Sequence, residues 1–226
     1  MALDDPQDSD AYLRPGDKAP PFVPPRIDTA SDEVKNAVEQ LYNEIQRLRA
    51  ELDHSHARLA ELETLANQDP LLPLLNRRAF IRELHMALGM KRRHKIPACL
   101  MYIDMDGLKA INDGFGHAAG DAALQHISTT VALAIRTTDA VGRLGGDEFG
   151  VILLHANLEA AAAKAEEIAK SLRRTPLAWQ NLTIPVSISW GLHEMGEGET
   201  VVQVIEAADQ AMYHARSERR RNRATE

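Results

Sequence analysis

The chain has 226 residues, 44% hydrophobic and 26% charged, a composition that excludes wholesale disorder and a fibrous fold. With 33 acidic against 26 basic residues, its formal net charge of -7 argues against a protein that binds nucleic acid nonspecifically over a broad basic surface. A single cysteine, Cys99, an acidic N-terminus and the lack of an apolar run long enough to span a membrane predict a soluble cytoplasmic protein.

Residues 1–30 are rich in proline. Six of the eleven prolines lie within the first 25 residues, among small and acidic residues, and no apolar period is present. This pattern predicts a disordered tail, and a peptide ligand for a partner is the alternative.

Residues 31–67 have a heptad pattern, which predicts a coiled-coil helix. Flanking charges favour a parallel homodimer, because residues such as Glu44 and Arg49 would face each other without repulsion. A long amphipathic helix lying on the same chain is the alternative. His54 and His56 are interpreted as solvated, with a metal-binding pair as the second option. The a and d positions are Val34, Val38, Leu41, Ile45, Leu48, Leu52, Ser55, Leu59, Leu62 and Ala66.

Residues 68–226 alternate between helical and strand patterns. Such alternation predicts an α/β or α+β sandwich, in which helices cover one sheet. We expect strands over 98–103, 140–144, 149–154 and 186–190, and helices over 80–93, from about 121, over 158–172 and from 201.

Two carboxylates lie at the end of the first predicted strand. Asp104 and Asp106 are two residues apart, so on an extended chain their side chains point the same way. Paired oxygen ligands at a strand end suit Mg²⁺, although such aspartates also serve simply as turn formers.

A second acidic cluster, Asp147 and Glu148, follows Gly145 and Gly146 between two predicted strands. A Gly-Gly turn permits positive φ and close approach of another group. Acids on a turn are commonly just solvated, but beside Asp104 they would help to hold metal ions over a triphosphate.

From about Asp69 to Arg223 the sequence resembles the GGDEF family, the diguanylate cyclases, and Gly145 to Phe149 spell the family's signature. The resemblance implies a nucleotide-cyclase-like domain with a central, mainly antiparallel sheet flanked by helices. Further segments at the family's spacing are Asp69, Asn76 to Arg78, Phe80, Asp104 to Lys109, Asn112-Asp113, Gly116-His117, Gly120-Asp121, Ala208-Asp209, Ala211 to Tyr213, Arg216 and Arg220.

What the resemblance implies is the condensation of two GTP into cyclic di-GMP with release of pyrophosphate, by a homodimer. It implies two Mg²⁺ per active site, with Mn²⁺ as a substitute, held by Asp104, the carbonyl of Met105, and Asp147. Asp147, Glu148, Asp104 and Lys109 are the expected catalytic residues.

For the substrate, the resemblance implies guanine contacts from Asn112 and Asp121. A carboxylate can accept from guanine N1–H and N2–H together, which favours GTP over ATP. Lys109, Arg216 and Arg220 are the expected triphosphate contacts, and Leu108, Gly145 and Gly146 complete the expected substrate site.

A second, inhibitory site for the product is implied by Arg136 and Asp139, which have the form and offset of the family's R-x-x-D site. Arginine can contact guanine N7 and O6 or a phosphate, and aspartate accepts from the Watson–Crick edge of guanine.

The sequence departs from the family at several positions, none of them a catalytic group. Leu72 and Pro73 replace threonine and glycine in the entry turn, which puts its geometry in question. Gly107 and Leu108 replace a polar residue and phenylalanine. Arg216 and Arg219 replace lysine and glycine.

Two rival functions remain at this point. One is a catalytically silent receptor that binds cyclic di-GMP through Arg136 and Asp139, and the other is a scaffold whose coiled coil recruits a partner. The input is open: an upstream sensor or scaffold protein, a ligand, or constitutive dimerisation would each fit. We expect neither nucleic acid nor a membrane as partner.

Overall fold

The computed structural model describes the backbone of residues 31–223. It divides into two compact units, Met1–Leu59 and Ala60–Glu226. The proline-rich segment 1–30, expected to be disordered, lies outside the described residues. Within 31–223, no helix is both long and apolar enough to cross a membrane.

The predicted long helix is present as α1 (Asp32–Asn67). In the first unit its apolar stripe is uncovered in the single chain: Leu41 and Leu48 are 64% and 50% exposed. Arg47 pairs along the same helix with Glu44 at 2.6 Å and with Glu51 at 2.5 Å. An exposed apolar stripe is what one strand of a coiled coil presents, and its pairing with a second copy stays a prediction.

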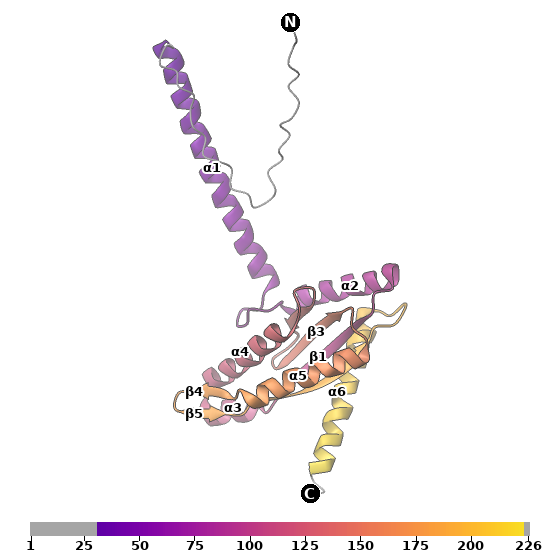
Figure 1. The fold of residues 1–226 in the computed structure, drawn as a ribbon. Helices are drawn as coiled ribbons and strands as arrows, with labels where there is room; N and C mark the ends of the chain where they lie inside the picture. Colours follow the sequence, from indigo (N-terminus) through magenta and orange to yellow (C-terminus); the bar gives the residue numbers. More distant parts are fainter. Residues whose placement is uncertain (1–30, 224–226) are drawn as a thin grey trace. The chain divides into compact units, whose positions relative to one another are not determined.

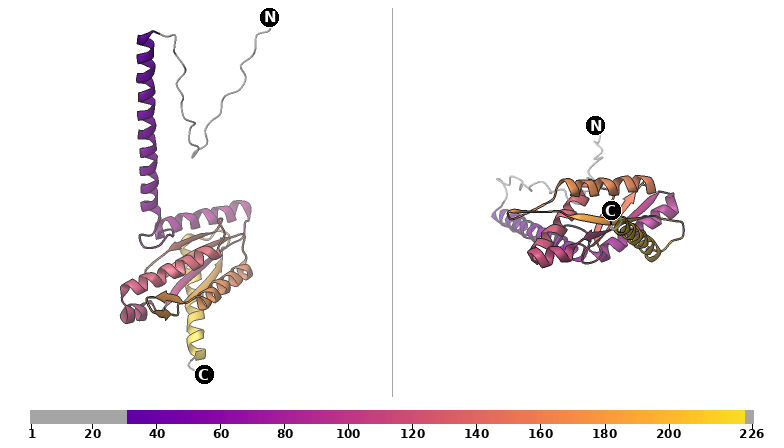
Figure 2. Two further views of the ribbon diagram at one scale, coloured as in Figure 1. Left: turned by 60° about the vertical axis from the view of Figure 1, so that its left-hand side comes forward. Right: turned by 90° about the horizontal axis from the view of Figure 1, so that it is seen from below.

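The second unit contains a four-stranded antiparallel sheet in the order β2-β3-β1-β6. Helices flank this sheet in the views of Figures 1 and 2. This confirms the expected mixed fold with a mainly antiparallel sheet and flanking helices. The strands are β1 (Ala98–Asp106), β2 (Ala140–Arg143), β3 (Glu148–Leu154) and β6 (Ser187–Glu194), and a separate hairpin joins β4 (Leu177–Trp179) to β5 (Leu182–Ile184).

Two hydrophobic cores cover the two faces of the sheet. Met101 and Ile103 of β1 belong to the core formed with α4 (His117–Ala134) and α5 (Leu158–Arg174). Leu100 and Tyr102 belong to the core formed with α2 (Arg77–His94) and α6 (Val201–Arg223). Because successive side chains of a strand alternate between faces, the even-numbered residues of β1 point toward α2 and α6.

Several elements differ from the expected boundaries. β1 continues three residues beyond the apolar run, because its pairing with β6 extends to Asp106 opposite Ser187. Helix α4 begins at His117, four residues before Asp121. Helix α3 (Leu108–Phe115) and the β4–β5 hairpin were not expected from the sequence.

Candidate active site at the end of the central strand

Asp104 and Asp106 share the face of β1 that α6 covers. Arg216 of α6 donates from Nη1 to Oδ1 of Asp104 at 2.6 Å, and its Nη2 lies 3.6 Å from Oδ1 of Asp106. Asp106 also accepts from the hydroxyls of Ser189 at 2.8 Å and Ser187 at 3.1 Å. The side-by-side arrangement expected from the two-residue spacing is therefore present, and an arginine bridges the pair.

The electrostatics of Asp104 are unusual for an aspartate. Burial raises the pKa of Asp104 to about 6, Arg216 acts in the opposite direction, and the nearby carboxylates of Asp147, Asp106 and Glu148 raise it further. A buried carboxylate that neighbours other acids favours a bound cation, because a cation relieves both the repulsion and the loss of solvation.

The β2–β3 turn brings the second acidic cluster to the same corner. Glu148 lies directly opposite Asp104 in the β1–β3 register, and the amide of Met105 donates to the carbonyl of Asp147 at 3.0 Å. The two acidic clusters, 43 residues apart in the sequence when counted from Asp104 to Asp147, thus meet at one end of the sheet.

The Gly-Gly turn differs from expectation in its backbone. Among the described residues, positive-φ glycines are Gly107, Gly116 and Gly198, and neither residue of the Gly145-Gly146 pair. What Gly145 provides is space, since a Cβ there would overlap the carboxylate of Glu148. The turn therefore uses the space that glycine leaves at Gly145 and does not use the positive φ that glycine permits.

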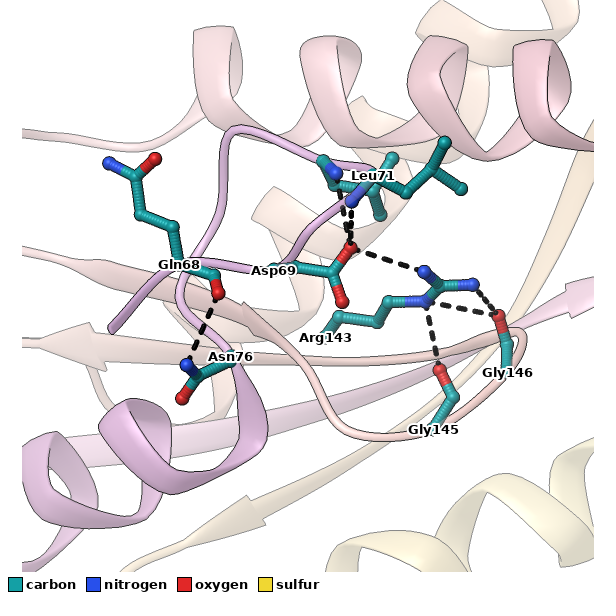
Figure 3. A network of polar contacts seen from close by, with 8 residues as sticks. Gln68, Asp69, Leu71, Asn76, Arg143, Gly145 and Gly146 are labelled. Atoms are coloured by element: carbon teal, nitrogen blue, oxygen red, sulfur yellow. Dashed lines mark hydrogen bonds and ion pairs between the residues drawn. The ribbon is translucent and has the colours of Figure 1, made fainter. Parts of the chain in front are cut away.

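Two arginines hold this turn, and Figure 3 shows the contacts of one of them, Arg143. Arg143 donates to the carbonyl of Gly145 at 3.1 Å, to that of Gly146 at 2.7 Å, and to Oδ1 of Asp69 at 3.1 Å. Arg77 donates to the carbonyl of Leu144 at 2.8 Å. The turn is therefore tied through Arg143 to the segment that follows α1.

The entry turn that carries the departures Leu72 and Pro73 is closed by hydrogen bonds to Asp69. Oδ1 of Asp69 accepts from the amides of Leu71 and Leu72, both at 3.0 Å. Leu72 is fully buried in the core that includes α4 and α5. The apolar replacement thus adds core contact, while Asp69 still closes the turn. Gly107, another departure, has φ 77° before α3, a left-handed conformation that glycine adopts without strain.

The expected guanine contacts come together where α3 meets α4. A Cβ on Gly120 would overlap Oδ1 of Asn112 and crowd Leu108, so the glycine allows the amide of Asn112 to lie against α4. Asp121, the next residue, is exposed, as is Lys109 of α3. Asn112 and Leu108 are half-buried beside an exposed carboxylate, an arrangement suited to a polar planar base.

The expected inhibitory site lies apart from this corner. One expected triphosphate contact, Arg220, has no described side chain. In the expected inhibitory site, Asp139 accepts from the amides of Arg136 at 3.0 Å and Leu154 at 3.1 Å, while Arg136 is exposed between α4 and β2. Asp139 therefore shapes the local backbone, and Arg136 is free to reach a ligand.

The donor set at the corner fits a divalent cation that shares its ligands with a substrate. No group of three or more His, Cys, Asp or Glu side chains forms a metal cage within residues 31–223 as described. Mg²⁺ is commonly bound by one or two carboxylates with substrate phosphates and water rather than by such a cage. Asp104, Asp147 and the Met105 carbonyl supply oxygen donors of that kind.

Several contributors escaped the sequence interpretation. Arg143 and the serines that bond Asp106 carry no motif of their own, and the place of Arg77 in the segment Asn76 to Arg78 does not indicate its contact with the turn. Tyr102 is a further case: burial raises its pKa, and its interactions with Glu148 and Asp209 raise it further. The only sequence signal for Tyr102 is its even position on β1, which places it on the face of Asp104.

Comparison with known proteins agrees with this geometry. The family model "Diguanylate cyclase, GGDEF domain" matches residues 66–222. The chain is 35% identical over 190 residues to the diguanylate cyclase TpbB of Pseudomonas aeruginosa, covering 81% of this chain and 44% of TpbB. It is 32% identical over 168 residues to the probable diguanylate cyclase DgcE of Escherichia coli, covering 74% and 15% of the two chains.

Solved structures show the same similarity. The coiled coil and GGDEF domain of DgcB from Caulobacter crescentus, in complex with c-di-GMP, has a TM-score of 0.73 at 26% identity, covering 79% of this chain and 95% of that one. The diguanylate cyclase SiaD in complex with its activator SiaC from Pseudomonas aeruginosa has a TM-score of 0.66 at 27% identity, covering 82% and 73%.

The chain spans less than half the length of the curated relatives cited above. The matched region nevertheless includes the whole sheet, both layers of helices and the acidic corner. The chain belongs to the diguanylate cyclase GGDEF domain family.

Proposed function

We propose that this chain is a diguanylate cyclase that condenses two GTP into cyclic di-GMP. The observation that carries the proposal is the meeting of Asp104, Asp147 and Glu148 at one end of the sheet. A catalytically silent receptor that binds cyclic di-GMP through Arg136 and Asp139 would not need these three carboxylates at the acidic corner.

In the proposed reaction, the 3'-hydroxyl oxygen of each GTP attacks the α-phosphorus of the other. Each attack forms one P–O bond, breaks the bond to pyrophosphate and releases the hydroxyl proton. Two Mg²⁺ ions, or Mn²⁺, would lower the pKa of the hydroxyl and neutralise charge on the phosphates.

The protein's residues would position these groups. Asp104, the Met105 carbonyl and Asp147 would bind the metal, and Glu148, which lies opposite Asp104 in the strand register, is poised to assist. Asn112 and Asp121 would select guanine. Lys109, Arg216 and Arg220 would bind the triphosphate, beside the backbone of Gly145 and Gly146 and the apolar side chain of Leu108.

Dimerisation and product inhibition belong to the same proposal. Because each domain would bind one GTP, two domains must face each other, and a parallel coiled coil of α1 would raise their effective concentration. Cyclic di-GMP bound at Arg136 and Asp139 would inhibit the enzyme. A solved relative is in complex with c-di-GMP and another with its activator, which supports a regulated enzyme and leaves room for an upstream protein partner here.

The cell compartment can be inferred from the chemistry. Cys99 is a buried free thiol, and the proposed substrate is a nucleoside triphosphate, so we expect the enzyme to work in the reducing cytoplasm.

The test is incubation of the full chain with GTP and Mg²⁺, followed by chromatography of the nucleotides. Cyclic di-GMP should form, and Asp147→Ala should abolish it. Glu167→Ala, on the exposed face of α5, removes a carboxylate outside the site and should retain full activity. Binding of added cyclic di-GMP without turnover would favour the receptor instead.

A further inference from the structure

In the protein without ligands, Arg216 contacts Asp104, a carboxylate on which the proposed function depends, and its neighbour Asp106. Its guanidinium lies 2.6 Å from Asp104 and 3.6 Å from Asp106. The contact is shielded from solvent, with side-chain exposures of 30% for Arg216 and 12% for Asp104. It differs from the exposed pairs of α1 and α5, which solvent screens.

The local charges explain why a cation is held there. The carboxylates of Asp106, Asp147 and Glu148 all act on Asp104, and all disfavour its ionised form. Arg216 is the cation that offsets them in the protein alone. The planar fork of arginine reaches both strand aspartates, whereas a lysine ammonium is a single point charge.

The arginine contact competes with a metal ion at Asp104. A divalent cation binds a carboxylate oxygen at about 2.1 Å, and the guanidinium already lies within hydrogen-bond distance of the same oxygen. Two cations so close together repel each other strongly in a partly buried site. Metal binding at Asp104 therefore favours the departure of Arg216, and Arg216 opposes the binding of metal.

A triphosphate offers Arg216 a second partner. Guanidinium groups pair with phosphate as readily as with carboxylate, so movement from Asp104 to a phosphate exchanges one charge-assisted contact for another. A metal ion arriving alone provides no such replacement.

We propose that Arg216 is a built-in counter-cation that blocks Asp104 against the divalent metal until a nucleoside triphosphate draws the guanidinium away. The inference rests on the proposed function. Metal and nucleotide then bind cooperatively, and since linkage is reciprocal, each strengthens the binding of the other by the same factor. Such coupling keeps the empty site from binding metal without substrate.

The test measures Mn²⁺ binding to the full chain by the electron paramagnetic resonance of free Mn²⁺. Without nucleotide, Arg216→Met should bind Mn²⁺ at least fivefold more tightly than the wild type, which is the low end of typical couplings between sites. Arg216→Lys should fall between them. Arg173→Met, which removes the exposed Arg173–Glu166 pair of α5, is the matched control and should bind like the wild type.

The same titration is then repeated with α,β-methylene-GTP, an analogue that cannot release pyrophosphate. It should tighten Mn²⁺ binding to the wild type at least fivefold and to Arg216→Met much less. Thermal unfolding checks that each variant is folded. If Arg216→Met does not fold, the comparison of Arg216→Lys with the wild type still tests the inference.

Two results would overturn the inference in distinguishable ways. Equal Mn²⁺ affinity of the wild type and both Arg216 variants without nucleotide would refute the block while leaving the metal site intact. Absence of Mn²⁺ binding in every protein, even with the analogue, would refute the metal site of the proposed function itself.

Discussion

The surroundings of Asp104 disfavour its ionised form. Its pKa is about 6 in the folded protein because of burial, against a reference value of 3.8 in the unfolded chain. The native state thus holds a proton to higher pH than the unfolded state does. By linkage, this group's contribution to stability is complete below pH 4 and is lost as the pH rises to about 6 and beyond.

Asp104→Asn should therefore become more stable relative to the wild type as the pH rises from 4 to 7. The expected gain is about 2 to 3 kcal/mol in the free energy of unfolding. Urea unfolding with EDTA at each pH measures it, and the difference near pH 4, where Asp104 is protonated, is the internal reference. A difference that does not change with pH would contradict this account of Asp104.

Arg136 provides a sharper test of the inhibitory site than Asp139 does. Asp139 accepts from two backbone amides, so its removal would disturb the loop itself. Arg136→Ala removes only an exposed side chain. Loss of an arginine contact to guanine should raise the inhibition constant of cyclic di-GMP on the order of tenfold without changing the initial rate. Inhibition assays with added product measure it, and unchanged inhibition would argue against the site.

At the scale of elements, Arg143 links the turn after β2 to the segment that follows α1. It bonds two turn carbonyls and Asp69, and both side chains of the ion pair are less than one fifth exposed. We expect Arg143→Ala to lower kcat more than it raises the KM for GTP, because the turn that carries Asp147 and Glu148 loses its support.

The same substitution should lower the free energy of unfolding by about 2 to 3 kcal/mol, through lost hydrogen bonds to a charged group. A double-mutant cycle with Asp69→Ala, followed by urea unfolding, should give a coupling of at least about 0.5 kcal/mol. Arg173→Ala, in an exposed pair, is the control. Additive effects would show that the entry turn and the catalytic turn are independent.

Elements with a strong periodic pattern were predictable from the sequence, and those formed by tertiary pairing were not. The eight-residue α3 is only about two turns long and contains Asn112, Asp113 and Gly114, which are weak helix formers, so its pattern is too short to signal a helix; Ile111 packing into the core holds it in place. The β4–β5 hairpin turns at Gln180, which has φ 53° without a glycine to mark it.

The candidate site divides in the same way. The acidic residues were identified from spacing and family resemblance, and the strand register then brought them together. The contact of Arg216 with Asp104 joins residues 112 apart in the sequence, so no local pattern could indicate it. Arg143 likewise acts through carbonyl groups, which leave no trace in the sequence.

For the whole molecule, activity should depend on assembly. Each chain supplies one acidic corner, and the proposed reaction needs two GTP sites that face each other. The uncovered stripe of α1, which includes Leu41 and Leu48, is the surface that would join two copies.

Leu41→Glu with Leu48→Glu in the full chain should therefore yield a monomer. Two buried carboxylates per helix, at two successive d positions, would break the seam, and specific activity at low protein concentration should fall at least tenfold while rising with concentration. Gln40→Glu with Gln46→Glu adds the same charge outside the seam and should leave a dimer of full activity. Sedimentation and turnover measured at matched concentrations decide the matter: a monomer that retains full specific activity would show that α1 does not bring the half-sites together.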